Sequence, residues 1–552
     1  MTPSQQKVNV VPATEPWWSF PVSIRQDAAG THVRVAWRRL ILLLLGTGVA
    51  AWLALAAAVF LWVKYQRGFS DVQIGYILFP HRWKEYGKAR GDFYIEQAKE
   101  EIADQNWVQA IHHLRVGVAA SPSNTEGRLV LSQFFTIIGR IELAQRTLVE
   151  GLPYARDDTE YLKSLFGFLL QYQEDDEVRR IATELLPATP TVTPRNQLIA
   201  LAAATANFYR GAYDAAEKLI ADYSILQTKD GRMLSARIGW ERGNREQALA
   251  QLKRYTTEFP EDEEFYNQLA AYNRELGDFA AVAKFAFLRE LANPRSASAR
   301  IDLIQAYRNN NNTDQVRRAV DEFVADFARD VAALTLLANA GTENGDPALA
   351  RRIYDHLKGR QLETDAAGLM VMEAHVVAGE FRAALDFALE LSQTRPEWMQ
   401  KFLGVVNGLQ AVAYFGLGQR EDGELFLSHF MSQPNLRAEH FTAIANRLVA
   451  IGAKEPARKV LAHAVETNLR NQAALTRLID LDLDRPPSAE LAANLKRLLA
   501  MRRPAPDVLQ KARHRLGSDR FLFVAGRDEL LAAVQEAIDH SPAPVVSRAA
   551  AE

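Results

Sequence analysis

Two segments decide the fold: Asp104–Asn124, DQNWVQAIHHLRVGVAASPSN, and Ile138–Asp158, IGRIELAQRTLVEGLPYARDD. Three positions recur between them at an offset of 34 residues: Ala110 and Ala144, Leu114 and Leu148, Gly117 and Gly151. A fixed period of this length is typical of a repeat protein, in which each unit buries its apolar face against the next. The composition agrees, since Leu, Ala and Arg are abundant and no Val/Ile/Thr-rich alternating segment predicts a sheet.

Two later segments, Phe265–Pro294 and Gly368–Pro396, follow the same plan. Each has an apolar helix, a turn of glycine, acidic residue and aromatic residue, a second Ala-rich helix and a closing proline. The pattern resembles the tetratricopeptide repeat family, in its membrane-anchored bacterial type, over roughly Gly91 to Leu469. The resemblance implies an all-α fold whose helix pairs stack into a right-handed superhelical solenoid. About eleven units are expected.

Packing explains the residues that recur. Small residues are expected where the two helices of a unit cross, because they let the helix axes approach closely: Ala98 and Ala110, Ala236 and Ala248, Ala338 and Ala350, Ala445 and Ala457. Glycines fall where the first helix of a unit must end, as left-handed C-caps do: Gly243, Gly277, Gly345, Gly379, Gly418 and Gly452. The third and seventh units are degenerate, and the insert 188–196 interrupts the register.

A different kind of segment precedes the repeats. From Leu40 to Val63 there is no charge, and this run exceeds the roughly 20 residues that a helix needs to cross a bilayer. It is too long for a signal peptide and has no small-residue cleavage site after it, which favours an uncleaved anchor. Residues 39–64 are therefore predicted to be a transmembrane helix, with a stripe of small residues available to a partner helix: Gly46, Ala50, Ala54 and Ala58.

Basic residues near the two ends of this helix favour a cytoplasmic N-terminus only slightly: Arg25, Arg34, Arg38 and Arg39 precede it, and Lys64, Arg67 and Arg82 follow it. We expect a single-pass inner-membrane protein with its repeats in the periplasm. The remaining predicted segments are a largely disordered cytoplasmic tail at 1–38, a juxtamembrane cap at 65–90, repeats at 91–470, capping helices at 471–540 and a disordered tail at 541–552.

No catalytic or cofactor motif is present. The 552 residues include no Cys, which excludes disulfides, thiolate nucleophiles and Cys-ligated metals. Phosphate-binding, dinucleotide-binding, zinc-protease and nucleophile-elbow motifs are absent, and the net charge of −2 gives no reason to expect nucleic acid. The adjacent His112 and His113 point about 100 degrees apart on a helix and cannot form a metal pair. Asp480, Asp482 and Asp484 lack the glycine and glutamate of a calcium loop. We expect no enzyme, metal or cofactor.

The resemblance implies a binding site on the concave face, lined by one stripe of the first helix of each unit, where Asn and basic residues hold a peptide. Carried over by register, that stripe contains Met233, Arg237, Trp240, Asn267, Arg274, Glu275, Ile301, Gln305, Arg308, Asn339 and Glu343. Arg274 and Arg308 would be neighbours and could grip a carboxylate. The alternative is a merely solvated face whose charges pair with Glu241, Glu275 and Glu343. Apolar residues in the first and fourth units would flank the site: Ile95, Ile102, Leu198, Leu201, Phe208 and Tyr209.

These features predict a membrane-anchored scaffold that binds proteins or peptides in an envelope assembly, secretion or polysaccharide-export system. A second hypothesis keeps the fold but turns it to the cytoplasm. Membrane-anchored tetratricopeptide proteins that regulate lipopolysaccharide synthesis look similar in layout, although they end in a Cys-rich metal module that this chain lacks. A membrane-helix partner or homo-oligomer would use the small-residue stripe.

Overall fold

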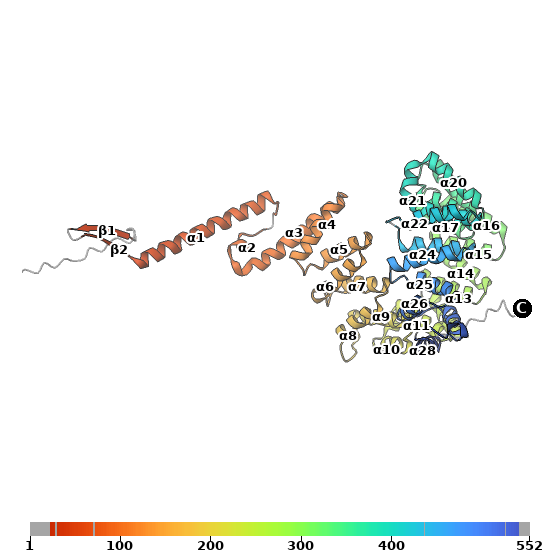
Figure 1. Ribbon diagram of the computed structural model, residues 1–552. Coiled ribbons are helices and arrows are strands. Elements are labelled where there is room, and N and C mark those ends of the chain that lie inside the picture. The colour runs from red at the N-terminus through yellow and green to blue at the C-terminus, as the bar shows by residue number, and fades with distance from the viewer. Residues whose placement is uncertain (1–21, 28–29, 70–71, 435, 525, 540–552) are drawn as a thin grey trace, which may run out of the picture. The chain divides into compact units, whose positions relative to one another are not determined.

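The computed structural model describes residues 22–27, 30–69, 72–434, 436–524 and 526–539, and the chain divides into two units, 1–165 and 166–552 (Figure 1). Both units are built from antiparallel helix pairs, so the predicted all-α repeat solenoid with one long apolar N-terminal helix is confirmed. The expected tail at 541–552 and the start of the expected N-terminal tail lie outside the described residues.

The N-terminal region contains a β-hairpin that the sequence did not predict. Strands β1 (Val22–Asp27) and β2 (Gly30–Val35) pair antiparallel, with Val22 opposite Val35 and Asp27 opposite Gly30. The expectation of a largely disordered tail up to residue 38 is therefore wrong for this part of the chain. β-branched and polar residues alternate from Val22 to Arg25 in β1 and from Thr31 to Val35 in β2, which suits a two-stranded ribbon.

The apolar stretch forms helix α1 (Trp37–Leu61), continued by a π-helical turn at Trp62–Gln66. A short helix α2 (Ile74–Leu78) and a 3₁₀ turn (Pro80–Arg82) follow. The Trp52 indole N–H donates to the Leu78 carbonyl at 3.0 Å, so this segment folds back along the second half of α1. Val63, Phe69 and Val72 form a small apolar cluster there.

Eleven helix pairs then run from α3 to α24. Their bounds are α3 Trp83–Ala103 and α4 Trp107–Ala120; α5 Thr125–Ile137 and α6 Ile141–Gly151; α7 Thr159–Gln171 and α8 Asp175–Leu185; α9 Pro194–Tyr209 and α10 Tyr213–Asp222; α11 Lys229–Glu241 and α12 Arg245–Glu258; α13 Glu263–Glu275 and α14 Phe279–Ala292; α15 Ala297–Asn309 and α16 Thr313–Asp326; α17 Val331–Glu343 and α18 Pro347–Gly359; α19 Asp365–Val377 and α20 Phe381–Thr394; α21 Pro396–Gly416 and α22 Arg420–Met431; α23 Ala438–Ala450 and α24 Lys454–Thr467. Four further helices end the described chain: α25 Gln472–Asp482, α26 Ala489–Leu499, α27 Pro506–Leu516 and α28 Arg527–Asp539.

Every turn inside these eleven pairs contains one residue with a positive φ angle. In chain order these are Gln105, Gly139, Gln173, Gly211, Gly243, Gly277, Asn311, Gly345, Gly379, Gly418 and Gly452. Seven of the ten intervals between them are 34 residues. The turns therefore show, independently of any comparison, the repeat length of a tetratricopeptide solenoid.

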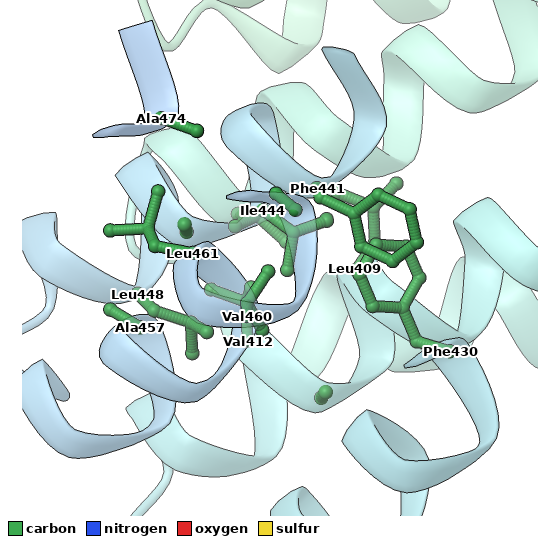
Figure 2. Close-up of a cluster of buried hydrophobic side chains, with 14 of the residues drawn as sticks. Leu409, Val412, Phe430, Phe441, Ile444, Leu448, Ala457, Val460, Leu461 and Ala474 are labelled. Carbon is green, nitrogen blue, oxygen red and sulfur yellow. The ribbon is translucent and has the colours of Figure 1, made fainter. Parts of the chain in front are cut away.

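Alanines fill the crossings between paired helices. Ala236 of α11 and Ala248 of α12 are both buried, as are the corresponding alanines of α3 and α4, of α17 and α18, and of α23 and α24. One cluster of buried apolar residues continues without a break from Ile301 in α15 to Val534 in α28. Figure 2 shows part of it, where Phe430 and Phe441 lie beside Leu409 and Leu448 packs near Ala457.

Candidate binding surface

The predicted stripe begins on α11, where its side chains link neighbouring repeats. The Arg237 guanidinium donates to the Gln268 side-chain oxygen on α13 at 2.9 Å. Trp240 is 3% exposed and stacks on Tyr272 of α13, with ring centroids 3.8 Å apart and planes 2° apart. Its indole N–H donates to Glu275 at 3.1 Å. Trp240 thus packs between two repeats, and Met233 beside it is also buried.

A second set of contacts links α15 to α17 and α18. Gln305 accepts from Asn344 at 2.9 Å, and Arg308 pairs with Asp346 at 3.0 Å. Asn339 donates to Glu343 at 3.0 Å within α17. These side chains hold one repeat to the next or bond within one helix, so any ligand that uses them must compete with an existing partner.

Asn267, Arg274 and Glu275 on α13 and Glu343 on α17 are exposed polar members of the stripe, and of these Glu275 accepts from Trp240 and Glu343 from Asn339. Arg274 also acts on Asp302 of α15: burial raises the pKa of the Asp302 carboxyl, while the positive charges of Arg289 and Arg274 oppose that rise. The two arginines that were expected to act together therefore differ. Arg274 is exposed to a ligand, whereas Arg308 is already paired with Asp346.

The acidic residues near this stripe have partners that the sequence did not name. Burial raises the pKa of the Glu275 carboxyl, the hydrogen bond from Trp240 lowers it, and the negative charge of Glu241 raises it further. Glu241 itself pairs with Arg503 at 3.0 Å. Arg503 and its neighbour Arg502 were not singled out from the sequence, because arginines in a loop between helices give no local signal of a distant contact.

The expected apolar flank is divided between core and surface. Ile95 is fully buried on α3, where it contacts the glycines of neighbouring helices, so it belongs to the core. Phe208 and Tyr209 on α9 are partly exposed, and Tyr209 lies against the Arg502 guanidinium.

The small-residue stripe of α1 is open along its length. Gly46, Ala50, Ala54 and Ala58 are all exposed, and a side chain added at Gly46 would meet no atom within 4 Å. Leu40–Gln66 is long and apolar enough to cross a membrane by length and composition.

His113 and the three alternating aspartates are held in structural contacts. His113 bonds Glu101 through Nδ1 at 2.9 Å and stacks on Tyr94. Asp482 pairs with Arg458, while Asp480 and Asp484 both pair with Lys511. In the described part of the chain, no group of three His, Cys, Asp or Glu residues could hold a metal ion.

No protein-family model and no curated protein matches the chain. Among solved structures it is similar to PilW, a type IV pilus biogenesis factor, at 16% identity and a TM-score of 0.28, covering 45% of this chain and 98% of that one. The match to the structure of Naa15/Naa10 bound to HypK-THB has 13% identity and a TM-score of 0.28, and it covers 89% of this chain and 78% of that one. The match to the APC/C hetero-tetramer Cut9–Hcn1 has 12% identity and a TM-score of 0.26, and it covers 82% of this chain and 86% of that one. At these TM-scores the description of the repeat rests on the chain's own turns and helix pairs.

Proposed function

We propose that the chain is a membrane-anchored scaffold that binds partner proteins or peptides and holds them at the inner membrane, in an envelope assembly, secretion or polysaccharide-export system. The observation that carries this is the exposed pair Asn267 and Arg274 on α13, set in a stripe whose other polar members are fixed by neighbours. A preformed surface loses little entropy on binding, and anchoring raises the effective concentration of the partner.

Pull-down from membranes tests the binding surface. Reversing the charge of Arg274 (Arg274→Glu) together with Asn267→Ala should remove most of the captured partner. Arg308 is left unchanged, because replacing it would also break its pair with Asp346. Lys284→Glu on α14 is the matched control, since it changes an exposed charge on the other helix of the same repeat. If the native protein, the α13 double variant and the Lys284→Glu control capture equal amounts of partner with helicity preserved, α13 does not bind the partner.

The anchor and its direction are proposed from the length of the apolar stretch and the slight excess of basic residues before it. Deleting residues 39–64 should release the repeats into the soluble fraction. An alkaline phosphatase fused to the C-terminus should be active if the repeats lie in the periplasm. An inactive fusion, with activity from a cytoplasmic reporter at the same position, would instead support the cytoplasm-facing adaptor.

A further inference from the structure

The second unit makes a long-range contact through the loop between α26 and α27. This loop lies across three successive turns of earlier repeats, α7–α8, α9–α10 and α11–α12, which precede α25–α26 by nine, eight and seven helix pairs. Its backbone is bound on both sides of Arg502: the Arg503 N–H donates to the Tyr209 carbonyl at 2.9 Å, and Arg210 donates to the Met501 carbonyl at 2.6 Å. In Figure 1 helix α26, which precedes the loop, projects beside α9 and α11, in agreement with these bonds.

Arg502 occupies the first of two side-chain sites. Its guanidinium makes two parallel hydrogen bonds of 2.8 Å to Asp175, whose side chain is 3% exposed. It lies 3.8 Å from the centre of the Tyr209 ring and donates to the Leu170 carbonyl. A planar fork against a carboxylate, with an aromatic ring on its face, selects arginine over lysine.

Arg503 occupies the second site, one turn further along. It pairs with Glu241 at 3.0 Å and donates to the Tyr213 hydroxyl. A Cβ built at Gly211 would lie 3.4 Å from the Arg503 Cδ, an ordinary van der Waals distance, so the arginine stem lies close to this turn. The two sites therefore accept two consecutive arginines of one loop segment.

Polar groups make this contact, and several are incompletely satisfied. Nε and Nη2 of Arg503 and the side-chain oxygen of Gln173, in the α7–α8 turn, are buried without a hydrogen-bond partner. A buried polar atom without a partner costs free energy that offsets part of the ion pairs. A third ion pair joins Arg470 to Glu174, the residue before Asp175. Adjacent repeats, by contrast, are joined through continuous apolar cores.

We propose that the edge formed by these three turns is a binding site for an Arg-Arg peptide segment, that the chain's own loop occupies it as an internal ligand, and that a partner segment with two consecutive arginines exchanges with the loop. The site is separate from α13 and stands whether or not the proposed function of α13 holds. An intramolecular ligand competes at an effective concentration of the order of millimolar, so a free peptide should displace the loop in that range.

Distance measurements between two spin labels test the exchange. The chain has no native Cys, so Lys218→Cys on α10 and Glu529→Cys on α28, both at exposed positions, give unique labelling sites in the full-length protein in nanodiscs. A single narrow distribution of distances between the two labels is expected while the loop occupies the site. The change of Arg502 and Arg503 to Ala should broaden the distribution of label-to-label distances and shift it to longer values.

The peptide LAMRRPA, which is residues 499–505, is then added at millimolar concentration. It should open the native protein and bind the Arg502→Ala, Arg503→Ala protein, whereas LAMKKPA should bind at least tenfold more weakly. Asp175→Asn with Glu241→Gln should abolish binding of either peptide. If the double alanine protein does not fold, Arg502→Lys with Arg503→Lys replaces it, because this variant keeps the charge and loses the fork.

Two results would overturn the proposal. An unchanged narrow distance in the folded variants means that the arginine sites do not hold the loop. Opening by the variants without binding of the Arg-Arg peptide means that the contact is a fixed structural closure only.

Discussion

At the residue scale, one backbone position per repeat explains both why the units are recognisable and why some are not. Eight of the eleven turns place glycine at positive φ, and three place Gln105, Gln173 or Asn311 there. Gln173 and Asn311 belong to the third and seventh units, which looked degenerate in the sequence. These units therefore keep the turn geometry while losing its glycine, at the conformational cost of a side chain in the left-handed region.

The first prediction follows from that cost. Gly243→Ala should lower the free energy of unfolding by about 1 kcal/mol, because the added methyl group has open space and only the left-handed backbone opposes it. Gln105→Gly should have the opposite sign and a smaller size, about 0.5 kcal/mol, since glycine also gains entropy in the unfolded chain. Urea denaturation followed by circular dichroism measures both. If both substitutions change the free energy of unfolding in the same direction, the positive φ angle does not explain these changes.

At the element scale, α13, α14 and α15 are joined by a nearly buried arginine. Arg289 of α14, whose side chain is 6% exposed, pairs with Glu263 at the start of α13 and with Asp302 of α15. Burial alone raises the pKa of the Glu263 carboxyl, but the hydrogen bonds and charge of Arg289, with hydrogen bonds from Asn293 and Ser296, outweigh it and lower the pKa overall. The charged form of Glu263 is thus favoured by folding.

A pH dependence follows from that direction. A carboxyl whose pKa is lower in the folded state contributes stability above its unfolded pKa of about 4.3. This contribution is lost as the pH falls through the folded pKa. Glu263→Gln should therefore cost about 1 to 3 kcal/mol at pH 7, and the difference from the native protein should shrink as the pH falls below 4. Glu264→Gln, at the exposed next position, is the control and should change stability little at either pH. A Glu263→Gln deficit that persists unchanged at low pH would contradict the ion-pair argument.

The sequence predicted helices better than it predicted the surfaces they present. The 34-residue period, with its recurring alanines and glycines, suffices to predict helix pairs, because each unit repeats the same local packing. The hairpin at residues 22–35 was missed because each strand is only six residues long. Trp240 was assigned to the concave stripe by register, yet it is buried, since its ring reaches across to Tyr272 of the next repeat. Register gives the position of a side chain on a helix but not the length to which it extends.

At the scale of the second unit, two kinds of connection hold distant segments together. The apolar core from α15 to α28 is continuous, so these helices share one buried surface. The contact of Arg502 and Arg503 with α7–α11 joins segments about 260 to 330 residues apart through polar groups. No sequence pattern announces such a contact, because it depends on how small rotations accumulate over many repeats.

The last prediction concerns the size of the cooperative block. Leu448 of α23 is fully buried in the continuous core, and Leu448→Ala should cost about 2 to 5 kcal/mol through the cavity it leaves. Because neighbouring helices share that core, amide hydrogen exchange should accelerate together from α15 to α28, while the separate cores of α9–α14 should keep their native rates. Leu425→Ala on α22, at a position that is 52% exposed, is the matched control and should change few amides. Acceleration confined to α23 and α24 would mean that each repeat opens alone, and acceleration in α9–α14 as well would mean that the loop at Arg502 and Arg503 transmits the loss across the whole unit.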